Sequence, residues 1–143
     1  MLDEGAKMPT RAHPWDAGLD LYAMEDAVVP HAEVFPFDEI QLGSAVIDTG
    51  VHVQIPKGYY GEIRSRSGLM CKHGITTDGT IDANYTGSIR VCLFNHRASA
   101  YTVKAGDKIA QLVIVPCLLP ELELVDHLEE TDRGDGGFGS TGR

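Results

Sequence analysis

The chain has 143 residues, of which 43% are hydrophobic, and its net charge is −9. This length and composition predict one globular domain with one core and exclude a disordered chain. The acidic excess argues against a protein that binds DNA or RNA as a polyanion, whereas one small phosphorylated ligand remains compatible with it.

Several other classes of protein are disfavoured by what the sequence lacks. No apolar run approaches the roughly 20 residues of a membrane span, and the first residues lack the apolar segment of a signal peptide, so we expect no membrane partner. The three cysteines are widely spaced, which argues against a disulfide framework and favours a reducing, cytoplasmic location. None of the six histidines has ligand-like spacing with a cysteine, so we expect no zinc site held by the protein.

Apolar residues alternate with a period of two along much of the chain. In chain order, the patterns predict a strand over Val51–Ile55, a short helix over Ser67–Gly74 with Ser67 as its cap, and strands over Ile89–Leu93 and Ile109–Val115. The last of these is almost continuously apolar, as expected for a strand covered on both faces. Turn residues recur about every ten residues, which predicts an all-β sandwich or barrel in a single domain.

The first polar motif is AGLDLYA, Ala17–Ala23. On a strand, Leu19 and Leu21 point to one face and Asp20 points to the other. Asp20 is therefore a candidate to hold a water on a bound cation, and an equally open interpretation gives it a structural role as a cap or an ion-pair partner.

The second motif is RSRSGL, Arg64–Leu69, which contains two arginines, two hydroxyls and a glycine. These donors, at the start of a helical turn, suit a phosphate. The alternative is a solvated charged loop. A Walker loop is excluded because GxxxxGK[ST] does not occur in the sequence.

The third motif is GTIDANYTG, Gly79–Gly87, the tip of a hairpin or a tight loop before a strand. Its free main-chain groups can pair with a flat base. Asp82 can orient and deprotonate a water, and the Tyr85 ring can lie under a sugar without room for a 2′-hydroxyl. The competing interpretation of Asp82 is a turn residue whose carboxylate bonds its own backbone.

Two further motifs complete the pattern. GDKIAQL, Gly106–Leu112, is a turn entering a buried strand, where the Gln111 amide needs either a structural partner or a ligand. The final residues 133–143, RGDGGFGSTGR, contain five glycines, and ordering them costs more than burying Phe138 returns. We expect a tail that orders over a nucleotide phosphate chain, and a frayed terminus is the alternative.

In this order, the five motifs resemble those of trimeric deoxyuridine triphosphatases (dUTP pyrophosphatases), from about Ala17 to the C-terminus. The resemblance implies a distorted β-barrel or jelly-roll (a dUTPase-like β-clip) over residues 1–131 and a C-terminal arm over residues 132–143. It also implies a homotrimer in which different subunits contribute motifs one, two and four, motif three, and the arm to each site. The implied reaction is the hydrolysis of dUTP to dUMP and pyrophosphate, which keeps uracil out of DNA and supplies dUMP for thymidylate synthesis.

The resemblance also implies a role for individual residues. Asp82 would be the base that holds the attacking water, and Asp20 would hold a water on a Mg²⁺ ion that the triphosphate carries. The implied substrate-binding residues are Arg66, Ser67, Gly68, Gly79, Thr80, Ile81, Tyr85, Arg90, Gln111, Arg133, Phe138, Gly139, Ser140 and Thr141.

The sequence departs from the family pattern at a few positions. The stretch Thr76–Thr80 is shorter than usual and carries Asp78, Ser65 stands where proline is usual, and Met70 replaces a smaller residue. Two other functions stay open. A dCTP deaminase shares the fold but needs an acid/base group aimed at the base, and a regulatory, nucleotide-sensing binding partner would use the same motifs without turnover.

Overall fold

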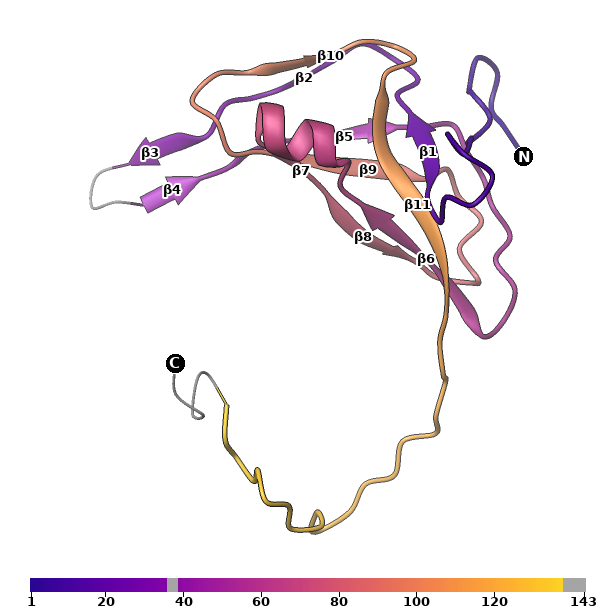
Figure 1. The fold of residues 1–143 in the computed structure, drawn as a ribbon, viewed down its shortest axis with the longest axis vertical. Helices are drawn as coiled ribbons and strands as arrows, with labels where there is room; N and C mark the ends of the chain where they lie inside the picture. Colours follow the sequence, from indigo (N-terminus) through magenta and orange to yellow (C-terminus); the bar gives the residue numbers. More distant parts are fainter. Residues whose placement is uncertain (36–38, 138–143) are drawn as a thin grey trace.

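Short strands dominate the computed structural model of the chain, which describes residues 1–35 and 39–137 (Figure 1). The strands of this part are β1 (Leu19–Tyr22), β2 (Ala27–Val29), β3 (Glu33–Phe35), β4 (Glu39–Gln41), β5 (Gly43–Asp48), β6 (Tyr59–Arg64), β7 (Ile75–Thr76), β8 (Asp78–Ile81), β9 (Arg90–Asn95), β10 (Tyr101–Val103) and β11 (Lys108–Pro116). One helical turn, η1 (Leu69–His73), lies between β6 and β7. The prediction of an all-β protein is therefore confirmed.

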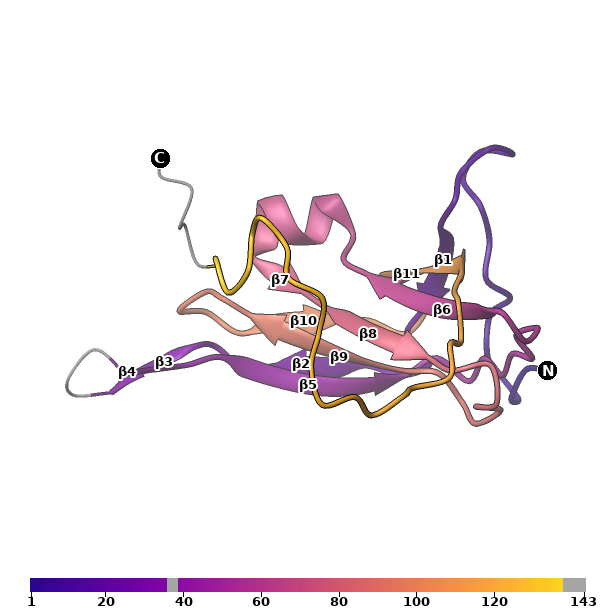
Figure 2. The same ribbon diagram turned by 90° about the horizontal axis from the view of Figure 1, so that it is seen from below.

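The strands pair antiparallel in four sheets, which stack in a jelly-roll-like arrangement. The largest has the order β1-β11-β6-β8, the second has the order β5-β9-β7, and the pairs β10-β2 and β3-β4 complete the set. Over the described residues these sheets stay open, so the barrel that the sequence suggested is not closed. Figure 2 shows the β3-β4 hairpin projecting from the body at the left and η1 lying above β7.

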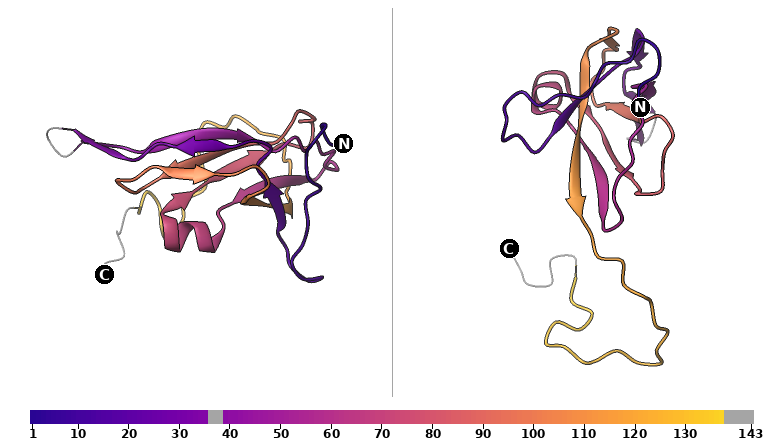
Figure 3. Two further views of the ribbon diagram at one scale, coloured as in Figure 1. Left: turned by 90° about the horizontal axis from the view of Figure 1, so that it is seen from above. Right: turned by 90° about the vertical axis from the view of Figure 1, so that its right-hand side faces the viewer.

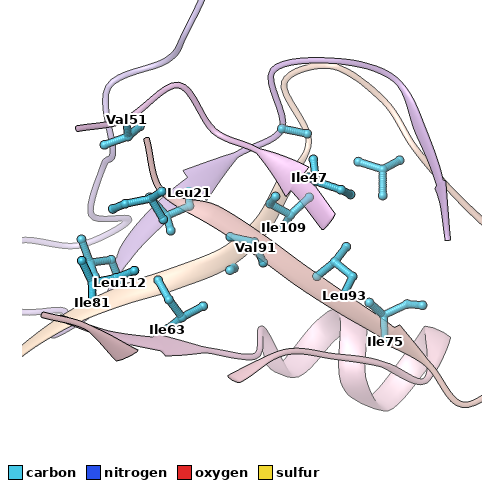
Figure 4. Packing of buried hydrophobic residues seen from close by; sticks show 14 of the residues in the cluster. Leu21, Ile47, Val51, Ile63, Ile75, Ile81, Val91, Leu93, Ile109 and Leu112 are labelled. Atoms are coloured by element: carbon cyan, nitrogen blue, oxygen red, sulfur yellow. The ribbon is translucent and has the colours of Figure 1, made fainter. Parts of the chain in front are cut away.

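The core lies between the two larger sheets (Figure 4). The alternation along β9 turns Val91 and Leu93 inward, into the same buried cluster as Ile63 of β6 and Leu112 of β11. All four side chains are almost fully buried. Burying one such side chain stabilises a fold by about 1.5–3 kcal/mol, so this packing fixes the positions of the strands that carry the polar motifs.

Two strand predictions need correction. Residues 51–55 are extended but form no strand, because their backbone groups find isolated partners rather than a ladder. The amide of His52 donates to the carbonyl of Met1, and the carbonyl of Val51 accepts from the amide of Ile89. Strand β11 exists as predicted, but it is buried only in its first half, since Ile114 is exposed.

The short helix forms where it was predicted, as the π-helical turn η1. Ser67 is not its cap, and no side chain bonds the first turn. A capping residue needs a non-helical backbone, whereas Ser67 already lies within the helical segment. The turn ends at Gly74, whose φ of +67° is the left-handed conformation that glycine adopts without strain.

After β11 the chain leaves the body of the domain (Figure 3). Residues 117–130 form no regular structure, and their large apolar side chains are strongly exposed, Leu118, Leu122, Leu124 and Leu128 almost completely. Within the described residues, no helix has the length and apolar character needed to cross a membrane.

Candidate functional site

Strand pairing brings three of the predicted motifs to one end of the largest sheet. Asp20 of β1 is paired with Gln111 of β11, and Gln111 is paired with Arg64 at the end of β6. Arg66 follows two residues later, so its side chain reaches back over the same row. The first, second and fourth motifs therefore meet within one chain, as the resemblance implies.

Asp20 is the centre of this group, and its side chain is only 3% exposed. Its Oδ1 accepts hydrogen bonds from the guanidinium of Arg66 at 2.6 Å and from Nε2 of Gln111 at 3.2 Å. Its Oδ2 lies 2.8 Å from Nζ of Lys108. We call Asp20, Arg66, Lys108 and Gln111 the Asp20 cluster.

The contacts of the Asp20 cluster support the structural interpretation of Asp20 and Gln111. The Gln111 amide bonds the carboxylate, which is the structural partner that a polar residue in a buried strand needs. Two cations surround one carboxylate, so the cluster keeps an excess positive charge. Since the side chains of Arg66 and Lys108 are 28% and 41% exposed, an anionic ligand can still reach them.

Lys108 was not among the predicted site residues. It stands three positions before Gln111, and residues three apart on a regular strand face opposite sides of the sheet. The register of β1 and β11 shifts between Leu21 and Tyr22, so that Leu21 pairs with Ala110 but Tyr22 pairs with Lys108. This irregularity brings Lys108 onto the face of Asp20, and no residue type in the sequence signals it.

The described residues offer no metal site built from protein ligands alone. They contain no group of three or more His, Cys, Asp or Glu side chains that could hold a metal ion. Mg²⁺ usually keeps several waters and binds through one or two carboxylates plus substrate phosphates. Asp20 fits that pattern, because each carboxylate oxygen has two lone pairs and Oδ2 contacts only Lys108 among the described residues.

Exposed donors flank the Asp20 cluster. Ser67 and Gly68 are both exposed, and a Cβ added at Gly68 would meet nothing within 4 Å. A ligand can therefore approach the backbone here. Ser65, which replaces the usual proline, has a structural role, because its hydroxyl bonds both the amide and the carbonyl of Thr77 at 2.8 Å.

The third motif lies elsewhere on the same sheet. Its residues surround a hollow of about 440 Å³ that is lined by Thr80, Ile81, Asp82, Tyr85 and Arg90, together with Val46 and Cys92. The structure thus brings five predicted site residues together. Gly79 lies in β8 opposite Ile63 and is not part of the lining.

The carboxylate of Asp82 is not used by the fold. The turn after Asp82 is closed by its backbone carbonyl, which accepts from the amide of Tyr85 at 3.0 Å. Its side chain is exposed and makes no hydrogen bond to another described residue. The alternative interpretation, in which the Asp82 carboxylate bonds the backbone of its own turn, is therefore wrong. The carboxylate remains available to a water or a ligand.

Tyr85 is held in place by its own loop. Its hydroxyl donates to the carbonyl of Ser88 at 2.9 Å, which folds the ring over Gly87. A Cβ at position 87 would lie only 2.6 Å from that hydroxyl oxygen, so glycine is required for this approach. The ring stays 39% exposed and lines the hollow next to Asp82.

The region around the third motif is not a hairpin. β8 pairs with β6, whereas β9 pairs with β5 and β7, so residues 82–89 connect two different sheets. The stretch Thr76–Thr80 is mostly strand and passes from one sheet to the other at Thr77. Because β8 is the last strand of its sheet, half of its main-chain donors and acceptors face outward without a strand partner, which suits the reading of a base edge.

The two halves of the predicted site are far apart within one chain. Asp78, Arg64, Gln111 and Asp20 form one row across the four strands of the largest sheet. Asp82, directly after the end of β8, lies four residues beyond Asp78, about 13 Å at the usual rise, and three strand spacings, about 14 Å, from the strand of Asp20. Backbone positions 20 and 82 are therefore roughly 20 Å apart.

The arm carries the remaining predicted residues. Arg133 lies in a turn, where its Nε donates to the carbonyl of Gly136 at 2.8 Å. Phe138, Gly139, Ser140 and Thr141 lie outside the described residues, and their predicted contacts with a ligand stay predictions.

Comparison with known sequences identifies one family. The family model described as dUTPase matches residues 4–142 of the chain. A deoxyuridine 5′-triphosphate nucleotidohydrolase of Arabidopsis thaliana is 46% identical over 142 residues, which is 99% of this chain and 80% of that protein. Its counterpart in Gloeothece citriformis (strain PCC 7424) is 44% identical over 144 residues, covering 99% and 92% of the two chains.

Comparison with solved structures gives the same result. The Staphylococcus bacteriophage 80alpha dUTPase with dUPNHPP is similar with a TM-score of 0.85 and 34% identity, over 100% of this chain and 96% of that one. A mutant dUTPase from phage phi11 of S. aureus, described as revealing the coordination of a structural Mg(II) ion, is similar with a TM-score of 0.76 and 34% identity. That match covers 90% of this chain and 95% of the phage chain.

Proposed function

Because the chain belongs to the dUTPase family, we propose that it hydrolyses dUTP to dUMP and pyrophosphate by attack of water on the α-phosphorus. The observation that carries this mechanism is the unused carboxylate of Asp82, which lines a hollow beside Tyr85. A carboxylate so placed can orient a water and accept its proton as the water attacks. In a cytoplasmic setting this activity keeps uracil out of DNA and supplies dUMP for thymidylate synthesis.

The base and the sugar bind around the third motif in this proposal. Outward-facing main-chain groups of Gly79, Thr80 and Ile81 on the edge strand β8 pair with uracil. The Tyr85 ring lies against the deoxyribose, where a 2′-hydroxyl would collide with it. Arg90, which lines the same hollow, contributes positive charge near the phosphates.

The phosphate chain binds the Asp20 cluster and its exposed neighbours. Arg66, Ser67, Gly68 and Gln111 contact the phosphates, and their positive charge and donors stabilise the charge that develops there. Mg²⁺ carried by the triphosphate would supply further charge neutralisation, and Asp20 would hold it through a water. Arg133, Phe138, Gly139, Ser140 and Thr141 of the arm close over the nucleotide and exclude bulk water.

We further propose that the active site is shared between the chains of a homotrimer. A separation of roughly 20 Å prevents Asp82 and Asp20 of one chain from serving the same α-phosphate. Residues 117–130, which lead to the arm, leave the body with leucines exposed, and a second copy of the chain offers a surface that can bury them. A closed assembly satisfies both observations.

The substrate is tested with Mg²⁺ and, separately, dUTP, UTP, dCTP and dTTP, measuring pyrophosphate and ammonia. We expect pyrophosphate from dUTP alone, and Asp82→Asn should bind dUTP yet turn it over about 100 to 10,000 times more slowly. Ammonia from dCTP would instead identify a deaminase. Folded protein that hydrolyses none of the four would identify a nucleotide-sensing binding partner, and full turnover by Asp82→Asn would refute the role of Asp82.

The sharing of sites is tested by mixing two inactive variants. One carries Asp82→Asn in the full chain, and the other keeps Asp82 but ends at Gly137. If Asp82 and the arm reach each site from different chains, co-refolding the two should restore about one quarter of the activity, because one site in four then has both parts intact. Trimers that form, as judged by a mass three times 15.5 kDa, but regain no activity would contradict the shared site.

A further inference from the structure

The loop that carries Asp82 and Tyr85 rests on one neighbouring segment, residues 48–52, which we call the support segment. The hydroxyl of Thr49 donates to the carbonyl of Ile89 at 2.7 Å, and the carbonyl of Val51 accepts from the amide of Ile89 at 2.8 Å. The hydroxyl of Ser88 donates to the carboxylate of Asp48. These contacts fix the end of the loop at the start of β9.

His52, at the end of the support segment, contacts the middle of the loop. Its Nδ1 lies 2.9 Å from the carbonyl oxygen of Thr86, the residue that follows Tyr85. Its Nε2 lies 3.1 Å from a carboxylate oxygen of Asp3. The imidazole therefore joins the loop to the N-terminal segment.

Both neighbours of the imidazole are hydrogen-bond acceptors. A neutral imidazole has one N–H and can satisfy only one of them, whereas the imidazolium donates to both. The bond to the Thr86 carbonyl, and next the bond to Asp3, raise the pKa of His52 above its usual value of 6.5, while desolvation and, to a smaller extent, the α-amino group of Met1 oppose the shift. The hollow on which His52 borders is otherwise apolar, lined by Leu2, Met8, Pro9, Leu19, Val51, Val53 and Leu112 with Met1.

We propose that His52 is a positioning residue for dUTP binding, and that its imidazolium holds the loop of Asp82 and Tyr85 in place through Thr86. When the imidazole is neutral, Thr86 and Asp3 compete for a single N–H, so the loop is held only part of the time. This inference rests on the proposed function. The affected step is the placement of Tyr85 against the sugar, since Thr86 is its neighbour in the chain.

Three variants separate the two contacts of His52. In His52→Asn the amide nitrogen takes the place of Nδ1, so the bond to Thr86 is kept but no longer titrates. In His52→Gln the amide takes the place of Nε2, so only the contact with Asp3 is kept. His52→Ala keeps neither contact.

The kinetic readout is the KM for dUTP from about pH 6 to pH 8.5, a range that spans the ordinary histidine pKa. His52→Asn serves as the reference at each pH, because its KM changes only with titration of the nucleotide and of other groups. The ratio of the wild-type KM to the His52→Asn KM should rise about 2- to 10-fold as the pH increases, which is the usual effect of one hydrogen bond. His52→Gln and His52→Ala should have, at every pH, the higher KM that the wild type shows only at high pH. Their kcat should change much less, and they should discriminate less well against UTP. A wild type that parallels His52→Asn at all pH values would overturn the proposal.

A second readout needs no turnover. Amide hydrogen exchange of residues 82–88 is compared between the wild type and His52→Asn at each pH, without nucleotide. Each protein is measured at the same number of degrees below its own Tm. The wild-type loop should exchange faster than the variant loop only above the pKa of His52. If the protein hydrolyses no nucleotide, the proposed function fails while this comparison still tests His52, and equal exchange in the two proteins at all pH values refutes its positioning role.

Discussion

The contacts of Asp20 make it a clamp that holds Arg66, Lys108 and Gln111 together, and Asp20→Asn tests this directly. The variant keeps the shape of the side chain and one acceptor oxygen. It removes the negative charge between Arg66 and Lys108, whose nitrogens lie 2.6 Å and 2.8 Å from the carboxylate. It also turns one oxygen into an amide donor that faces other donors.

The size of the effect follows from burial. Removing one partner of a fully buried ion pair costs about 3–5 kcal/mol. Here the carboxylate is buried, but Arg66 and Lys108 are 28% and 41% exposed, so water can resolvate the cations that are left. We therefore expect a loss of about 2–3 kcal/mol, which lowers Tm by about 7–10 °C for a chain of this length.

The assay is urea and thermal unfolding at a fixed protein concentration, without Mg²⁺ or nucleotide. The control is Asp26→Asn, because Asp26 and Lys104 make an ion pair of similar length, 2.7 Å, between exposed side chains. The control should leave Tm nearly unchanged, and the deficit of Asp20→Asn should persist in high salt since buried charges are poorly screened. If Asp20→Asn unfolds like the wild type and loses only activity, Asp20 acts on the metal or the substrate and the clamp is refuted.

The other predictions concern the support segment and the core. Partial burial raises the pKa of Asp48, but hydrogen bonds from Ser88 and from the amide of Gly50 outweigh it and lower the pKa below 3.8. Asp48 therefore stabilises the fold above an unfolded pKa of about 3.8, and this stability is lost on acidification. The Tm advantage of the wild type over Asp48→Asn should therefore be largest near about pH 6 and shrink below about pH 4; a constant difference would contradict it. Gly50→Ala should destabilise far more than Gly58→Ala in urea unfolding, because both have positive φ but only at position 50 would the new Cβ overlap neighbouring atoms. Asn95→Ala should cost about 3 kcal/mol by the same measurement, since this fully buried amide bonds backbone groups of Pro30, Arg97 and Ser99; a loss below about 1 kcal/mol would show that water replaces it.

The fold class was predictable because burial on a sheet leaves a period-two pattern in the sequence. Strands β9 and β11 were predicted almost to their ends for this reason. The pattern reports burial, however, and not pairing. Residues 51–55 alternate as a strand does, yet their partners are single residues from distant segments, so the pattern predicted a strand that does not form.

The residue types of the candidate site were also predictable, but their contacts were not. Asp20 and Gln111 stood out as polar residues among apolar neighbours, and the structure joins them. Lys108 could not be predicted as a site residue, because its position depends on a register irregularity between β1 and β11. The contacts of His52 could not be predicted, because both its partners, Asp3 and Thr86, lie more than 30 residues away in the chain.

The division of the site follows from the architecture of the largest sheet. Asp20, Gln111 and Arg64 meet because β1, β11 and β6 are neighbours in register, and the same register places the loop after β8 at the other end of the sheet. No adjustment of side chains closes a gap of roughly 20 Å between two points on one rigid sheet. This separation is the reason for proposing that a second copy of the sheet completes each site, and in such an assembly the surfaces between chains matter to catalysis as much as the residues that touch the nucleotide.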